Sequence, residues 1–169
     1  MDRKIQQMKR SYNFGFTYIG ILLTIVLLGA TLAAVGSSWS LLHRRALEQE
    51  LLYVGQAYRR AIESYYRITP NGVHQYPSSL EDLIDDERGA KVVRHLREMY
   101  VDPLTGSANW TVISLPGGAI IGVASQSNKQ PLKQANFGPW EAAFTDTKCF
   151  CDWQFVYLPQ LVNNSDSST

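Results

Sequence analysis

The chain has 169 residues, enough for one folded domain and an additional element, and its composition is that of a globular protein. The formal net charge is +1, but the first ten residues hold four basic side chains against Asp2, leaving 12 basic and 14 acidic side chains in the remainder. No global basic field results, so nucleic acid is not expected as a partner.

A stretch without charged residues follows the basic N-terminus. Residues Ser11 to His43 contain no Asp, Glu, Lys or Arg, and Tyr18 to Val35 is apolar apart from two glycines and two threonines. About 20 such residues suffice for a helix to cross the core of a bilayer. The flank before the stretch is the more basic one, which predicts a cytoplasmic N-terminus and an exported remainder.

An ordinary secretory signal is the alternative interpretation of this stretch. Cleavage would then follow a small-x-small site such as Ala34-Val35-Gly36. However, the apolar run exceeds the roughly 7–15 residues of a signal core and begins abruptly with aromatic residues. These features favour a retained membrane helix over residues 16–40.

Residues 41–68 predict an amphipathic continuation of the same helix. Apolar side chains recur there at steps of three and four, with polar side chains largely between them. No proline interrupts the chain from Phe16 to Ile68, and the first break is Thr69-Pro70-Asn71-Gly72. The apolar positions are Leu47, Leu51, Val54, Tyr58, Ala61 or Ile62, and Tyr65; the polar positions are Arg44, Arg45, Glu48, Gln49, Arg59, Arg60 and Glu63.

The segment after the break, residues 69–162, predicts a globular head. A helix is expected to start near Tyr76-Pro77, with Ser78 and Glu81 at the spacing of a capping box and Ser79 and Asp82 offering a second register. A further helix is expected from Ala90 to Met99, before the turn residues 102–106.

Three strands complete the predicted head. They are expected at Trp110–Leu115, Ala119–Ala124 and Trp153–Leu158, and Pro116-Gly117-Gly118 joins the first two as a hairpin. The predicted fold class is therefore α+β, with the long N-terminal helix packed on a small antiparallel sheet. The polar tail, residues 163–169, is expected to be disordered.

The residues Phe14-Gly15-Phe16-Thr17-Tyr18-Ile19, after a basic leader and before the apolar run, resemble the processing site of type IV pilins and type II secretion pseudopilins. The resemblance implies that a prepilin peptidase removes residues 1–15 by cutting after Gly15, and that Phe16 becomes the N-methylated mature N-terminus. Tyr76-Pro77, and Asp102-Pro103 before the strands, resemble the head of major pseudopilins.

The resemblance also implies a pilin-like fold and a function without catalysis. The chain would be a subunit of a type II secretion fibre that supports protein export across the outer membrane. It would be a single-pass protein of the bacterial inner membrane with a periplasmic head. Its partners would be other pseudopilins or pilins, the prepilin peptidase, the inner-membrane assembly platform and the lipid bilayer.

One position departs from the family's pattern. The family usually has a glutamate as the fifth mature residue, and Gly20 stands there in this chain. In relatives that carboxylate pairs with the N-terminal ammonium of a neighbouring subunit, as a charge inside lipid requires. Minor pseudopilins at the fibre tip can lack it, which suggests a tip or initiating role. Alternatively, glycine lets helices approach closely.

No motif in the sequence supports catalysis. The widely spaced His43, His74 and His95 are interpreted as surface or structural residues. Major pseudopilins have a calcium site near the C-terminus, for which Asp146 and Asp152 are the candidates, but the family's acidic loop motif is not matched, and no cofactor is expected. A second acidic cluster is interpreted as a solvated helix face and comprises Glu81, Asp82, Asp85, Asp86 and Glu87.

Cys149 and Cys151 form a Cys-x-Cys pair in a domain expected to reach an oxidising compartment. In an extended strand both thiols would point to the same side, which permits a small-ring disulfide. Free thiols, a metal link and an intermolecular link remain open.

Two further functions share these sequence features. The first is a minor type IV pilin of a twitching or DNA-uptake machine. The second is a solitary membrane-anchored periplasmic binding module that does not polymerise.

Overall fold

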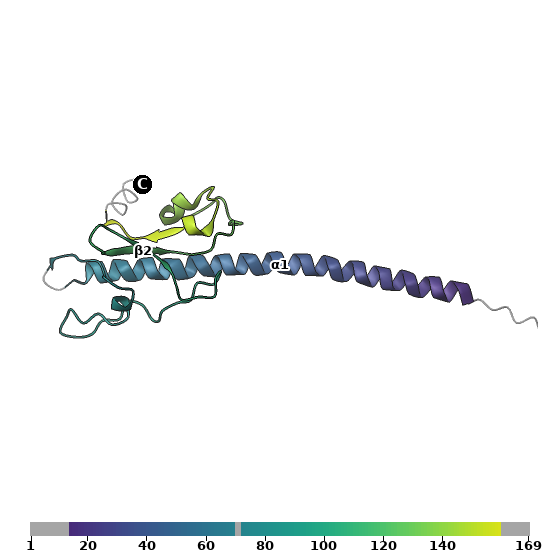
Figure 1. The fold of residues 1–169 in the computed structure, drawn as a ribbon, viewed down its shortest axis with the longest axis horizontal. Helices are drawn as coiled ribbons and strands as arrows, with labels where there is room; N and C mark the ends of the chain where they lie inside the picture. The colour runs from purple at the N-terminus through teal and green to yellow at the C-terminus, as the bar shows by residue number, and fades with distance from the viewer. Residues whose placement is uncertain (1–13, 70–71, 160–169) are drawn as a thin grey trace, which may run out of the picture. The chain divides into compact units, whose positions relative to one another are not determined.

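The computed structural model describes residues 14–69 and 72–159 (Figure 1). Most of the expected leader and all of the expected polar tail lie outside these ranges. The chain divides into two compact units, Met1–His43 and Arg44–Thr169. The fold class is α+β, as predicted: one long helix, three 3-10 turns and a three-stranded antiparallel sheet.

Helix α1 runs from Phe14 to Arg67 and confirms the prediction of one continuous helix. Its backbone is unbroken because the segment contains no proline. Beyond its end, the Ile68 N–H still donates to the Ser64 carbonyl at 3.0 Å, and the Thr69 hydroxyl donates to the Tyr66 carbonyl at 3.0 Å. Among the residues that the structure describes, no helix combines the length and the hydropathy of a membrane span.

The apolar face of α1 predicted for the second unit is buried, with one exception. Leu47 is only half-buried, while the other predicted core positions enter a single hydrophobic cluster. The members on α1 are Leu51, Val54, Tyr58, Ala61, Ile62 and Tyr65. Glu48, expected on the polar face, is instead buried. It is buried because its carboxylate accepts two backbone N–H groups from a loop 84 and 85 residues away in the sequence.

The sheet has the order β1 (Thr111–Ser114), β2 (Ile120–Ala124) and β3 (Gln154–Val156), antiparallel throughout. All three predicted strands are confirmed, each one to three residues shorter than expected. Figure 1 shows the sheet beside the later half of α1. All five residues of the central strand β2 are buried, and because successive side chains point to opposite faces, both faces of this strand are covered.

The turn between β1 and β2 forms the hairpin predicted at Pro116-Gly117-Gly118. The Leu115 N–H donates to the Ala119 carbonyl at 2.8 Å, and the Gly118 N–H donates to the Leu115 carbonyl at 3.0 Å. Gly117 and Gly118 have φ values of 106° and 88°, a region that glycine adopts without a steric penalty. The two glycines therefore set the reversal of the chain.

The predicted helix from Ala90 to Met99 is wrong. Asp86 and Val93 form an isolated β-bridge, and the N–H groups of His95 and Leu96 both donate to the Leu83 carbonyl, at 2.9 and 2.8 Å. These bonds use the backbone groups that a helix would pair internally. The segment instead follows an irregular path that buries Leu96.

The helix expected near Tyr76-Pro77 is reduced to the 3-10 turn η2 (Glu81–Leu83). Of the two capping registers, the one between Ser79 and Asp82 is formed. The Asp82 N–H donates to Ser79 Oγ at 3.3 Å, and the Ser79 N–H donates to Asp82 Oδ2 at 3.0 Å. The same carboxylate also accepts the N–H and hydroxyl of Ser78, both at 2.9 Å. Asp82 therefore holds a turn and is not part of a solvated helix face.

Candidate functional site

The predicted processing and assembly residues lie at the start of α1. Gly15 and Phe16 lie within α1, in the first turn that the structure describes, and Phe16 is 84% exposed. Gly20 follows about one turn later, and its carbonyl accepts the Thr24 hydroxyl at 2.7 Å. A Cβ placed on Gly20 would meet no atom within 4 Å. A larger side chain would therefore fit at this position within the subunit.

Every residue from 16 to 32 is exposed, and most of them are apolar. Because consecutive residues are exposed, the apolar surface covers all sides of the helix and not one stripe. Exposed apolar surfaces of this extent mark interaction surfaces. The large exposed side chains are Phe16, Tyr18, Ile19, Ile21, Leu22, Leu23, Ile25, Val26, Leu27, Leu28 and Leu32.

A buried ionic network lies at the other end of α1, within the head. Asp86 accepts the Arg88 Nε and Nη2 groups at 2.8 and 2.7 Å and the Arg88 backbone N–H at 3.1 Å. The hydrogen bonds from the Arg88 guanidinium hold the pKa of the Asp86 carboxyl far below its usual range. Asp86 is only 4% exposed, so its assignment to a solvated helix face is wrong.

His95 connects this network to α1. Its Nε2 lies 3.2 Å from Asp86 Oδ2, and its Nδ1 lies 2.8 Å from Ser64 Oγ. The three side chains are those of a hydrolase triad, but here Nδ1 and not Nε2 faces the serine. The ring is also completely buried, at 0% exposure, which leaves a substrate no access to it. The network is structural, in agreement with the interpretation of His95.

The other two histidines lie at the surface. His74 is exposed and stacks on Tyr66, with 4.8 Å between the ring centroids, and His43 is also exposed. His43 belongs to the first unit of the chain, and His74 and His95 belong to the second.

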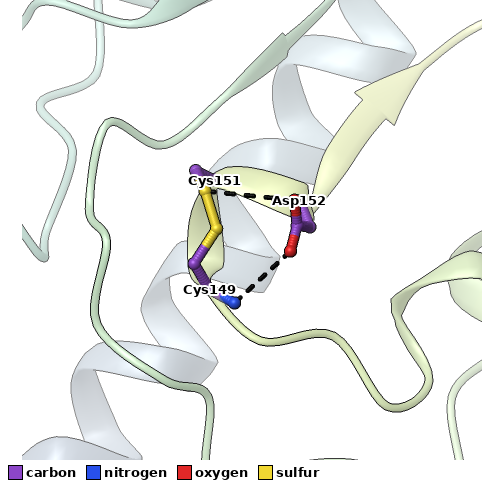
Figure 2. Close-up of side chains that lie close together, drawn as sticks. All are labelled: Cys149, Cys151 and Asp152. Carbon is purple, nitrogen blue, oxygen red and sulfur yellow. Dashed lines mark hydrogen bonds between the residues drawn. A yellow bond between two sulfur atoms is a disulfide. The ribbon is translucent and has the colours of Figure 1, made fainter.

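Figure 2 shows the Cys149–Cys151 pair joined as a disulfide at the 3-10 turn η4 (Phe150–Asp152), with 5.1 Å between the two Cα atoms. The two cysteines lie at this turn and not in the extended strand assumed from the sequence. The side chain of Asp152 accepts the Cys149 N–H at 3.4 Å and lies 4.0 Å from Cys151 Sγ. The turn places Phe150 in the core, where its ring contacts Trp153 edge-on.

Of the two calcium candidates, only Asp152 lies in a group of possible metal-ligand residues. Within residues 14–69 and 72–159, three or more His, Cys, Asp or Glu side chains converge only at Cys149, Cys151 and Asp152, and both cysteine sulfurs there are in the disulfide. Asp146 is outside this group and has a φ of 57°, with its N–H donating to the Gln134 carbonyl at 3.3 Å.

Two buried carboxylates have roles that sequence reasoning missed. Asp102 is completely buried; it accepts the Ser125 hydroxyl at 2.7 Å and the Leu104 N–H at 2.9 Å. Glu48 is the second. The turn predicted at residues 102–106 indicates that the Asp102 side chain can accept a nearby backbone N–H. No residue near Glu48 in the sequence indicates the N–H groups that its carboxylate accepts.

Comparisons with protein-family models, with curated proteins and with solved structures found no match to this chain.

Proposed function

We propose that the chain is a pseudopilin, a subunit of a type II secretion fibre of the type IV pilus kind. One observation carries the proposal. Helix α1 contains Gly15-Phe16, presents an exposed apolar surface over residues 16–32, and then supplies part of the core of the small α+β head from Leu51 onward. In a single subunit, the apolar surface of such a helix is not covered by the rest of the chain that the structure describes.

The proposed mechanism is helix packing in a filament. Subunits add head to tail, and such heterologous contacts form open filaments when the rotation does not close a ring. The apolar surface of residues 16–32 passes from lipid to neighbouring helices, so extraction from the bilayer is compensated by packing. The membrane anchor itself is proposed from the sequence, where Ser11 to His43 contains no Asp, Glu, Lys or Arg.

Because Gly20 replaces the glutamate that the family usually has, the proposal also places the chain at the tip of the fibre, as a tip or initiating subunit. A tip or initiating subunit needs no carboxylate of its own at this position, while its Phe16 amine can still pair with a glutamate of another subunit. The head would lie in the periplasm, and the partners would be other pseudopilins, the prepilin peptidase and the assembly platform.

Mass spectrometry of the mature protein from its native host tests the proposal. We expect an N-terminus at Phe16, carrying a methyl group. Gly15→Leu should leave the leader attached, because the family's peptidase requires a small residue before the cut. Gly29→Leu, deeper in the apolar stretch, is the matched control and should be cleaved normally. An N-terminus near Ser37 would instead indicate an ordinary secretory signal and refute the proposal.

A further inference from the structure

Basic side chains from two distant parts of the sequence gather at the start of the second unit. Arg44 and Arg45 are its first two residues. Arg44 lines a pocket together with Lys129, and Arg45 lines a neighbouring pocket together with Lys133. We name Arg44, Arg45, Lys129 and Lys133 the basic collar.

The loop that carries the two lysines is fixed from both sides. Glu48 Oε1 accepts the N–H groups of Leu132 and Lys133 at 3.1 and 3.0 Å, which attaches the loop to α1. On the other side, the Phe150 N–H donates to the Lys129 carbonyl at 3.0 Å. The buried Glu48 therefore acts as a positioning residue, and the collar is arranged before any ligand binds.

The carboxylate of Glu48 lines the pocket of Arg45 and Lys133, but the cations of the collar form no close ion pair with it. No carboxylate in the described part of the chain lies within 4.0 Å of the charged groups of Arg44, Arg45 or Lys129. Arg44 Nη2 makes only a long hydrogen bond to the Gln130 carbonyl, at 3.4 Å. Lys133 Nζ lies 4.5 Å from the centre of the Phe137 ring. Three of the four cations are thus available to an anion.

The pocket beside Arg44 and Lys129 has a volume of about 390 Å³ and walls that are mainly apolar. Its remaining lining is Leu47, Leu104, Gln130, Leu132 and Phe150. Cations beside apolar walls suit a ligand that carries both an anion and a hydrocarbon part. A free inorganic anion would leave the apolar walls without a partner.

We propose that the basic collar binds the phosphodiester of an anionic phospholipid, with the adjoining glycerol and first methylene groups against Leu47 and Leu132. Arg44 directly follows the Ser11–His43 stretch in the sequence, so a membrane helix there would place the collar at the level of the headgroups. This inference rests on the proposed membrane anchor. It gives the head a lipid contact that is released when the subunit enters the fibre.

Native mass spectrometry of the full chain in mixed detergent micelles tests the inference, with phosphatidylglycerol or phosphatidylcholine as the probe. We expect tighter retention of phosphatidylglycerol. The double variant Arg44→Gln/Lys129→Gln should weaken it about 30-fold, since each basic side chain near an anionic lipid contributes about fivefold in affinity. The matched control Arg60→Gln/Lys91→Gln removes the same charge from exposed positions elsewhere in the second unit and should have little effect.

Three results would overturn the inference: equal retention of the two lipids, equal losses in the two double variants, or displacement of phosphatidylglycerol by inorganic phosphate at the same concentration. Binding in micelles requires neither cleavage at Gly15 nor fibre formation. The two experiments therefore fail independently. An N-terminus other than Phe16 would refute the proposed function but would not decide whether the collar selects anionic lipid. An N-terminus at Phe16 together with unselective lipid binding would refute only the proposed lipid binding by the collar.

Discussion

The ring of Phe155, on strand β3, lies directly against the backbone of Gly55 on α1. A Cβ placed on Gly55 would overlap the ring. The ring has no room to move away, because Phe155 is 2% exposed and contacts Phe144 edge-on, with 5.1 Å between the centroids. Glycine at this position sets how closely the helix and sheet approach.

Gly55→Ala should therefore destabilise the head by about 2 kcal/mol. An overpacking cost of about 3 kcal/mol exceeds the gain of about 1 kcal/mol in helix propensity. Thermal unfolding of the full chain in detergent measures the change. Gly89→Ala, where the nearest contact of a Cβ is 3.5 Å, should be tolerated. Phe155→Leu should reduce the cost of the alanine; a full cost in that background would contradict the contact.

Val54→Asp should destabilise the head by several kcal/mol, because it places an unpaired carboxylate in the core. Leu51→Asp should behave alike, as Leu51 and Val54 are 0% and 4% exposed. Tyr53→Asp is the control on the same helix, since Tyr53 is 61% exposed. Urea unfolding separates the three variants, and equal midpoints for Val54→Asp and Tyr53→Asp would refute the assigned packing face.

Asp86 should make the stability of the head fall in acid. Its pKa is lowered in the folded state by the Arg88 guanidinium, so its contribution is present above the unfolded pKa of about 3.9 and is lost as pH falls toward the folded pKa. Asp86→Asn should cost about 3 kcal/mol at pH 7, because it leaves Arg88 without its partner. The variant should also show a smaller decrease in folding stability below about pH 4 than the wild type.

Asp85→Asn is the control for Asp86→Asn. The side chains of Asp85 and Arg94 are 63% and 61% exposed, so their ion pair at 3.6 Å should contribute less than about 1 kcal/mol. Urea unfolding at several pH values gives the comparison. The same acid dependence in wild type and Asp86→Asn would exclude Asp86 as its source.

Cys149 and Cys151 should be bonded to each other in the protein purified without reductant. Iodoacetamide should then modify neither cysteine before reduction and both afterwards, as read by intact-protein mass spectrometry. Reduction should also loosen turn η4 and expose Phe150, which increases proteolysis near that residue. Alkylation of unreduced protein would show free thiols, and a dimer sensitive to reductant would show an intermolecular link.

Gly20→Glu distinguishes a tip subunit from a fibre-body subunit. In a tip subunit the glutamate gains no amine partner, so fibre formation should be unchanged or impaired. Because a Cβ at Gly20 meets no atom within 4 Å, a steric clash within the subunit is not the source of any effect. Membrane crosslinking of the variant, alone and with neighbouring pseudopilins, is the measurement; longer homopolymers from the variant alone would refute the tip position.

The features predicted correctly from the sequence are those encoded by neighbouring residues. Helix α1 follows from an uninterrupted periodic segment, and the hairpin follows from Gly117-Gly118 between two β-prone runs. The candidate processing residues Gly15 and Phe16 and the unusual Gly20 form a short linear pattern, and their roles stay predictions.

Only the tertiary structure determines which polar groups are buried away from solvent and which partners they bind. Residues 90–99 have a helical pattern, yet two of their N–H groups bond to the Leu83 carbonyl instead. Glu48 has the spacing of an exposed residue, but a loop 84 residues later supplies the N–H groups that permit its burial. A buried polar group needs a partner, and that partner can come from anywhere in the chain. Local patterns therefore determined the helix and the hairpin, while the basic collar, the Asp86 network and the contact of Gly55 with Phe155 exist only once distant segments meet.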